Sequence, residues 1–183
     1  GGGAAEAQPV RAERVAFEAR KDRRIDHRSG VSQRLPITVL ENVISNAERR
    51  AVQTGEARIT PRIADLYAAL PAITGKLELE YEGELMGGAT IARELIRRAA
   101  DATLRDRVGP AAMDDVVIWF DAGAALQVTD EVPTAALRAA FDTVPGLSAF
   151  VDEVGLAPAG DAAAFAVGCE LVLESLVARR KLS

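Results

Sequence analysis

The stretch SQRLPITVLENVISNAERRAVQTG, residues 32–55, carries the clearest helical pattern in the chain. Ser32 is suited to be the N-cap of a helix, and Pro36 stands where only the first turn tolerates proline. Gly55 supplies the residue type that commonly ends a helix. Between these signals, apolar side chains recur at the three- and four-residue intervals of one helical face: Ile37, Leu40, Ile44, Ala47 and Ala51. We therefore predict one long amphipathic helix over this stretch.

The composition is that of an ordinary soluble globular protein. The chain has 183 residues, of which 49% are hydrophobic, 27% charged and 4% aromatic, and alanine is abundant, which favours helices over sheets. A net charge of −5 argues against a dedicated nucleic-acid-binding protein, because such proteins usually carry a basic surface. A single cysteine, Cys169, excludes an internal disulfide, and a single histidine, His27, nearly excludes a Cys/His zinc site, which needs about four such ligands. The sequence contains no apolar run of membrane-spanning length, and we expect a cytoplasmic location.

Helical periodicity recurs along the rest of the chain, and we predict at least six helices in total. Thr60 and Pro61 give a strong start signal, as N-cap and first helical residue, for a helix that Pro71 ends or kinks. Asp161 caps the last helix, whose buried face is expected to contain Phe165, Cys169, Val172 and Leu176. The other helices are expected over residues 9–24, 90–108 and 134–144, around Trp119, and in a short segment closed by Gly155.

Two segments depart from this periodicity. Residues 77–82 alternate an apolar side chain with glutamate, which is the period-two pattern of a strand. An extended connector is the alternative, because no second strand stands nearby in the sequence to pair with it. Residues 126–130, LQVTD, favour a brief strand. The predicted fold class is therefore mainly α, with at most a short β element.

The catalytic motifs that would identify an enzyme are missing. A P-loop needs G-x-x-x-x-G-K-[ST], and the only Gly-Lys pair, Gly75 and Lys76, fails at both ends because Leu70 and Leu77 occupy the required positions. The G-x-G-x-x-G, H-E-x-x-H and G-x-S-x-G patterns are also absent from the sequence. A Ser-His-Asp triad would have to use His27, which stands in a highly charged segment. We therefore expect no complete catalytic cycle on this chain alone.

The charged residues with a possible function each have a plainer interpretation. Arg34, at the start of the long helix, is either a solvated charge beside a turn or a side chain placed to meet a phosphate. The four glutamates of residues 78–84 could hold a metal ion, but alternating carboxylates usually face solvent, and we predict no metal site. A basic run could contact phosphate or nucleic acid, but Asp22 and Asp26 interrupt it and favour a solvated helix end: Arg20, Lys21, Arg23, Arg24 and Arg28.

Three apolar or sulfur-containing side chains are expected to pack rather than react. Cys169 falls on the apolar face of the last predicted helix, where a thiol behaves as a small hydrophobic group. Trp119 and Phe120 are expected to anchor the core of the second half of the chain. The alternative for these two rings is a surface that binds a partner.

Several segments resemble one family in the same order along the chain. Gly30-Val31-Ser32-Gln33-Arg34 resembles the sensor-2 turn of AAA+ ATPases in the MoxR and magnesium-chelatase I-subunit branch. The segment ENVISNAERRAVQTGE resembles the helix and exit of the lid that follows this turn in the family. Two further segments resemble a C-terminal extension of bacterial proteins labelled magnesium-chelatase-like or sigma-54-interacting: PRIADLYAALPAITGKLELEYEGE and VVIWFDAGAALQVTDEVP.

The resemblance implies a division of the chain and a role for Arg34. By the resemblance, residues 9–57 would be the helical lid and residues 58–183 the extension, while the Gly/Ala-rich composition of residues 1–8 predicts a flexible lead or cloning scar. Arg34 would be the sensor-2 residue that contacts the terminal phosphates of ATP, and Gly30 and Ser32 would form its supporting turn and cap. Arginine suits this role because it stays charged and presents forked donors.

The resemblance also implies cofactors and partners. ATP and Mg²⁺ would be bound by the parent protein, and the partners would be its own AAA+ core, neighbouring subunits of a ring and a von Willebrand A-type protein. The Walker A, Walker B, sensor 1 and arginine-finger regions of the family have no counterpart in this sequence, so the chain would not hydrolyse ATP by itself. The alternative from another class is a stand-alone all-helical interaction module with no link to nucleotide.

Overall fold

The computed structural model describes residues 10–26, 31–109, 113–179 and 182, and this part of the chain is mainly helical, as predicted. Its only β contact is an isolated bridge between Ile25 and Leu79. The helical elements, in chain order, are α2 (Ala12–Lys21), α3 (Leu35–Thr54), α4 (Ile63–Ala68), α5 (Leu70–Thr74), α6 (Tyr81–Met86), α7 (Gly88–Val108), α8 (Asp114–Asp121), the 3-10 helix η1 (Thr134–Leu137), α9 (Arg138–Phe141), α10 (Leu147–Glu153) and α11 (Ala162–Ala178).

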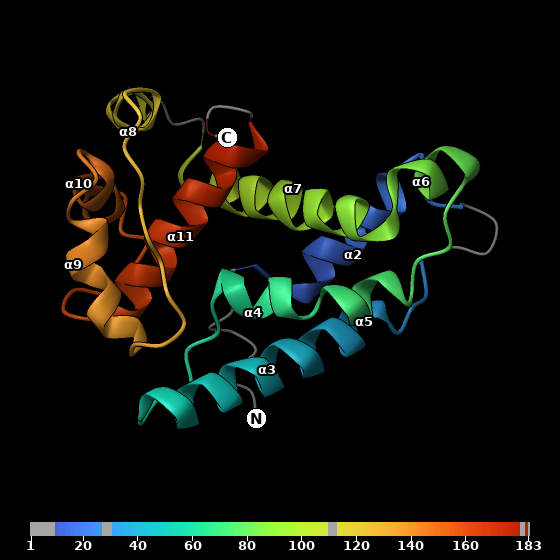
Figure 1. Cartoon of the computed structure of the whole chain (residues 1–183), viewed down its shortest axis with the longest axis horizontal. Helices are drawn as coiled ribbons and strands as arrows, with labels where there is room; N and C mark the ends of the chain where they lie inside the picture. The colour runs from blue at the N-terminus through green and yellow to red at the C-terminus, as the bar shows by residue number, and fades with distance from the viewer. Residues whose placement is uncertain (1–9, 27–30, 110–112, 180–181, 183) are drawn as a thin grey trace.

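The long helix α7 lies at the centre of the molecule (Figure 1). It contacts α5 and α6 near its start, and toward its end it packs against both α2 and α11. Helix α3 runs beside α2, α4 and α5, whereas η1, α9 and α10 pack on α11. The first and last thirds of the chain therefore meet through α7 and through the short helix α4, which touches both α3 and α11.

Helix α3 occupies most of the predicted stretch but begins at Leu35, with Arg34 rather than Ser32 in the cap position. The Ser32 hydroxyl accepts a hydrogen bond from the Arg34 backbone N–H at 3.2 Å, just before the helix. The predicted buried face was partly wrong, because Ile37 is 57% exposed. The face that packs against α2 and α4 consists of residues spaced four apart: Leu35, Val39, Val43, Ala47 and Ala51.

The next helix starts later than its sequence predicted. It begins at Ile63 with Arg62 as its cap residue, and the Asp65 carboxylate accepts the Arg62 backbone N–H at 2.8 Å. Thr60 and Pro61 therefore precede the helix instead of capping it. The predicted interruption before Pro71 is present, since α4 ends at Ala68 and α5 begins at Leu70.

The predicted strand over residues 77–82 is wrong. Its extended part is short: the Asp26 N–H donates to the Glu78 carbonyl and the Glu80 N–H to the Arg24 carbonyl, both at 2.8 Å, and α6 then begins at Tyr81. A Cβ atom at Gly83 would lie 2.5 Å from the Arg24 carbonyl oxygen, so this close approach requires glycine. Residues 126–130 are likewise not part of a strand.

The other long helices agree with their sequence patterns. Helix α7 covers the predicted residues 90–108 with two more at its start. Asp161 caps α11, since its carboxylate accepts the Ala164 N–H at 2.9 Å. All four residues expected on the buried face of α11 are buried: Phe165, Cys169, Val172 and Leu176.

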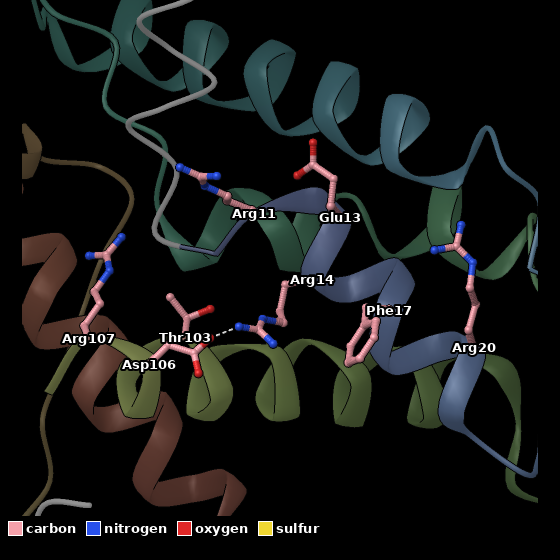
Figure 2. Close-up of a pocket in the computed structure, with 8 residues that line it drawn as sticks. All are labelled: Arg11, Glu13, Arg14, Phe17, Arg20, Thr103, Asp106 and Arg107. Carbon is pink, nitrogen blue, oxygen red and sulfur yellow. Dashed lines mark ion pairs between the residues drawn. The ribbon is translucent and has the colours of Figure 1, made fainter. Parts of the chain in front are cut away.

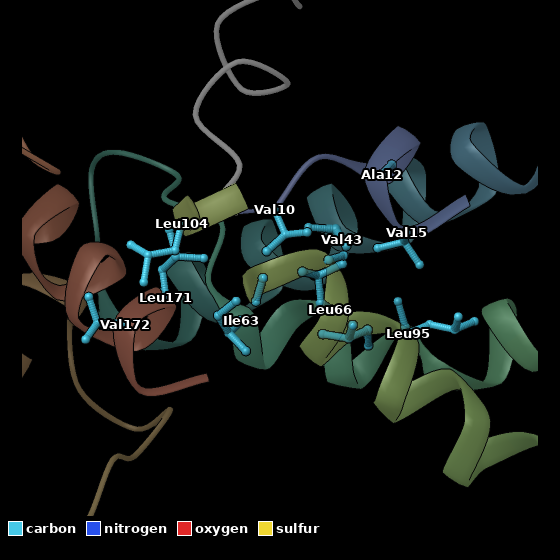
Figure 3. Packing of buried hydrophobic residues seen from close by; sticks show 14 of the residues in the cluster. Val10, Ala12, Val15, Val43, Ile63, Leu66, Leu95, Leu104, Leu171 and Val172 are labelled. Carbon is cyan, nitrogen blue, oxygen red and sulfur yellow. The ribbon is translucent and has the colours of Figure 1, made fainter. Parts of the chain in front are cut away.

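One hydrophobic cluster includes side chains from both ends of the described chain (Figure 3). Val15 and Val43, from α2 and α3, belong to the same cluster as Leu66, Leu95 and Leu171, from α4, α7 and α11. Burying such side chains is the main favourable contribution to folding, at about 25 cal/mol per Å² of apolar surface. The packing is therefore continuous across residue 57, while the division into a lid and an extension stays a prediction.

Candidate functional site

Arg34, the predicted sensor-2 residue, lies at the exposed start of α3. Its guanidinium group forms no hydrogen bond or ion pair with another residue in the described part of the chain. Val31 and Ser32, just before it, are half-buried. Gly30, the other predicted member of this turn, lies outside the described residues. The side chain of Arg34 is thus available to an anion that approaches the positive end of α3.

The far end of α3 carries a second arginine in the opposite environment. Arg50 is buried, and its guanidinium contacts the Asp65 carboxylate at 2.9 Å and the Glu56 carboxylate at 3.0 Å. It also donates to the Thr60 carbonyl at 2.6 Å and to the Thr134 hydroxyl at 3.0 Å. Burial acts to lower the pKa of Arg50, but the hydrogen bond and the attraction from Asp65 outweigh it and raise the pKa overall. Arg50 therefore stays charged and ties α3 to α4 and η1.

Arg62 forms a second buried ion pair, between α4 and α11. Its side chain is fully buried, and its Nε and Nη2 atoms donate to Glu170 Oε1 at 2.9 and 2.5 Å. The other Glu170 oxygen accepts the Ile63 backbone N–H at 3.3 Å. Burial raises the pKa of Glu170 above its usual value, although Arg62 acts in the other direction. Such a pair holds two elements in register, since neither charge can leave its partner without a large desolvation cost.

A third polar contact joins α4, α11 and α7. The Tyr67 hydroxyl donates to the Glu174 carboxylate, which Arg97 Nε approaches at 3.4 Å. Burial, followed by the negative charge of Glu174, raises the pKa of Tyr67. The phenol therefore stays protonated at neutral pH and acts as a hydrogen-bond donor, which suits a structural role rather than proton transfer.

None of the remaining candidates from the sequence forms a hydrogen bond or ion pair with the Arg34 side chain in the described part of the chain. Cys169 is completely buried, and burial, followed by the nearby Asp142 carboxylate, raises its thiol pKa to about 12. Trp119 and Phe120 are half-buried and stack edge to face, with ring centroids 4.9 Å apart. In the described part of the chain, no three His, Cys, Asp or Glu side chains come close enough together to hold a metal ion. The acidic run is fully at the surface: Glu78, Glu80, Glu82 and Glu84.

The basic run is divided between two environments. Arg24 is bound on one side by Asp22, at 2.7 Å, and on the other by Glu94, at 2.6 Å. Arg20 and Arg23 are exposed, and Lys21 lies 4.9 Å from the centre of the Phe17 ring. His27 and Arg28 lie outside the described residues.

The sequence held signals for the two buried arginine clusters. Arg50 follows Ala47 by three positions and Val43 by seven, so it stands in register with the buried face of α3. Glu170 is the single charged residue between Ala162 and Leu173, in an otherwise apolar part of α11. A charge in the middle of an apolar face indicates a buried partner, because an unpaired buried charge is prohibitively costly.

Among the helices of the described residues, none combines the length and the apolarity that crossing a membrane requires. No family model, no curated protein and no solved structure matches this chain.

Proposed function

We propose that this chain is the lid and C-terminal extension of an AAA+ ATPase of the MoxR or magnesium-chelatase type, working in the cytoplasm. One observation carries the proposal: Arg34 is exposed at the start of a 20-residue helix, and its guanidinium has no partner among the described residues. An arginine in that position can approach the terminal phosphates of ATP held on an ATPase core. There it would stabilise the negative charge that phosphoryl transfer redistributes.

The buried contacts of α3 support a second part of this role. A lid must convert the state of the nucleotide into movement of a rigid body. Arg50 and Arg62 link α3 and α4 to η1 and α11, so a displacement of α3 would be shared by the C-terminal half. Contacts to ring neighbours and to a von Willebrand A-type partner would then respond to ATP and Mg²⁺ bound on the core.

A second candidate function is a helical interaction module with no link to nucleotide. The continuous hydrophobic core favours it, because residues on both sides of position 57 pack into one cluster. Under this candidate, Arg34 is a solvated surface charge, and its replacement has no functional effect.

The experiment that separates the two candidates joins the chain to its ATPase core. Arg34→Ala is expected to lower ATP turnover at least about tenfold, since it removes a charged contact to the transition state. Arg34→Lys should recover only part of the activity, because lysine lacks the forked donor geometry. Arg23→Ala, at another exposed arginine, is the matched control. Unchanged turnover and unchanged nucleotide-dependent assembly in Arg34→Ala would overturn the first candidate and leave the second.

A further inference from the structure

A basic hollow lies between α2 and the end of α7, with a volume of about 600 Å³ (Figure 2). Two ion pairs, Arg14–Asp106 and Asp22–Arg98, show that these helices run antiparallel. Six of the side chains that line the basic hollow are Arg11, Arg14, Phe17 and Arg20 on the α2 side and Asp106 and Arg107 on α7.

Three of the four arginines that line the basic hollow form no ion pair with a described residue. Arg14 is paired with Asp106, but Arg11, Arg20 and Arg107 are exposed and form no ion pair with any residue in the described ranges. Phe17, between them along α2, is 48% exposed. Exposed arginines beside an aromatic ring are the residue types enriched where proteins bind one another.

Helix α6 presents the complementary surface, which we call the acidic α6 surface. Its members are all exposed, and none of its glutamates forms an ion pair with a described residue: Glu80, Tyr81, Glu82, Glu84 and Leu85. Tyr81 and Leu85 are 73% and 71% exposed, which is unusual for side chains of this size. The surface therefore combines negative charge with apolar groups, as the basic hollow combines positive charge with Phe17.

Within one molecule, no ion pair among the described residues joins the two surfaces, although the Arg20 side of the hollow lies four positions from Arg24, which contacts Met86 of α6. Helix α6 packs at the start of α7, near Gly88, while the basic hollow is lined by Thr103 and Arg107 at the other end of that helix (Figure 1). Fifteen residues of α-helix separate Gly88 from Thr103, which is about 22 Å at 1.5 Å per residue. Contact between α6 and the part of the hollow around Thr103 and Arg107 therefore requires a second molecule.

We propose that the acidic α6 surface of one copy of this chain docks into the basic hollow of a second copy. The glutamates form ion pairs with Arg11, Arg20 and Arg107, and Tyr81 or Leu85 covers the ring of Phe17. Because the two surfaces differ, the contact is head-to-tail, and each molecule can use both surfaces at once to build a ring or an open chain. The proposal specifies a contact between subunits and does not require Arg34 to touch a nucleotide.

The charges also argue against a nucleic acid as the occupant. Glu13 and Asp106 interleave with the arginines of the basic hollow, which would repel a uniformly charged phosphate backbone. The chain as a whole carries a net charge of −5, so the attraction is local to the basic hollow. A peptide surface that mixes carboxylates with apolar groups fits this pattern better.

Sedimentation velocity of the full chain tests the proposal. In about 20 mM salt the average mass should rise with protein concentration, and about 500 mM salt should reverse the rise, because screening removes contacts between exposed charges. The hollow variant carries Arg11→Glu, Arg20→Glu and Arg107→Glu, and the helix variant carries Glu80→Lys, Glu82→Lys and Glu84→Lys. Each variant alone should associate at least about tenfold more weakly, because its surfaces then repel each other.

Mixing the two variants is the decisive measurement. In the hollow variant both the hollow and the α6 surface are acidic, and in the helix variant both are basic, so each surface of one variant can pair with a surface of the other. The mixture should associate again. Control variants match the charge changes at other exposed sites: Arg23→Glu, Arg49→Glu and Arg93→Glu in one, and Glu41→Lys, Glu48→Lys and Glu153→Lys in the other. Each control should associate as the unmodified chain does.

Circular dichroism and urea unfolding establish that every variant is folded. A monomer at all concentrations in low salt would overturn the proposal. So would association that neither triple variant weakens, or a mixture of the variants that stays monomeric. None of these results depends on ATP turnover, so failure here is distinct from failure of the nucleotide-sensing role of Arg34.

Discussion

Arg50 of α3 donates a hydrogen bond to the hydroxyl of Thr134 at the start of η1, across 3.0 Å in space and 84 positions in sequence. The same guanidinium pairs with Asp65 and Glu56. One side chain thus joins the first, second and last parts of the fold, in a place where water cannot substitute for it.

Replacing Arg50 should be strongly destabilising. Arg50→Met removes the cation while Asp65 and Glu56 stay in place, and breaking a buried pair in this way costs about 3–5 kcal/mol. The neighbouring Arg49 is exposed, and Arg49→Met should change the free energy of unfolding by less than about 0.5 kcal/mol. Urea unfolding at neutral pH measures both. A loss below about 1 kcal/mol for Arg50→Met would mean that the buried network contributes little to stability.

The Arg62–Glu170 pair should show strong coupling. Arg62→Met alone leaves a buried carboxylate without its cation and should cost about 3–5 kcal/mol, whereas Arg62→Met with Glu170→Met should recover most of that loss. A double-mutant cycle from urea unfolding gives the coupling energy. Asp130→Ala is the control, because Asp130 also contacts Arg62, at 3.1 Å, but is 61% exposed. Additive effects of the two methionine substitutions would contradict a directly coupled pair.

Acid should destabilise the fold through Asp22. Its hydrogen bonds to Arg24, and then its contact with Arg98, hold the pKa of the Asp22 carboxyl well below its ordinary value of 3.8. The folded state therefore binds this proton less readily than the unfolded state. The stabilisation is fully present above about pH 4 and is lost as pH falls from there toward the folded pKa.

Asp22→Asn should therefore flatten the dependence of unfolding free energy on pH between about pH 4 and pH 2. Some slope will remain, because the pKa values of Asp101 and Asp161 are also lowered. Asp121→Asn, at an exposed position on α8, is the matched control. Thermal or urea unfolding across this pH range measures the effect. If the pH dependence of the unfolding free energy is unchanged in Asp22→Asn, Asp22 is not a source of the acid destabilisation.

The thiol of Cys169 should be inert in the folded protein. The thiolate is the reactive form, and a pKa of about 12 leaves almost none of it at pH 8. Reaction with a thiol reagent should be slow in the native state, with a rate that follows global unfolding, and fast in concentrated urea. Rapid labelling without denaturant would show that α11 opens locally.

Sequence patterns predicted those helices whose apolar periodicity and end signals are contained within the helix itself. Helices α7 and α11 have long apolar periodicities and clear ends, and both were located correctly. The predicted cap at Thr60 failed because Arg62 and Asp65 satisfy the start of α4, which has its cap residue two positions later. Ile37 was placed on the wrong face of α3 because apolar residues stand in two registers there, and only the packing against α2 and α4 selects one.

The segment after Leu77 shows how a tertiary contact can override a local pattern. Alternating leucine and glutamate predicted a strand, but Leu79 pairs with Ile25 in a single bridge and the chain then turns into α6. In α6, Gly83 packs against the Arg24 carbonyl, and this contact joins residues nearly 60 positions apart. A single sequence can indicate that Arg50 and Glu170 are buried, but it does not indicate which distant residue, Thr134 or Arg62, each of them contacts.

Helix α3 also has a mechanical consequence. Arg34 and Arg50 are 16 residues apart on it, which is about 24 Å at 1.5 Å per residue. Neither glycine nor proline interrupts residues 37–54, so the helix has no soft joint along this length. One end is open to solvent and the other is clamped inside the core. A displacement at Arg34 would therefore reach the Arg50 contacts with Asp65 of α4 and Thr134 of η1 instead of being absorbed by bending of the helix.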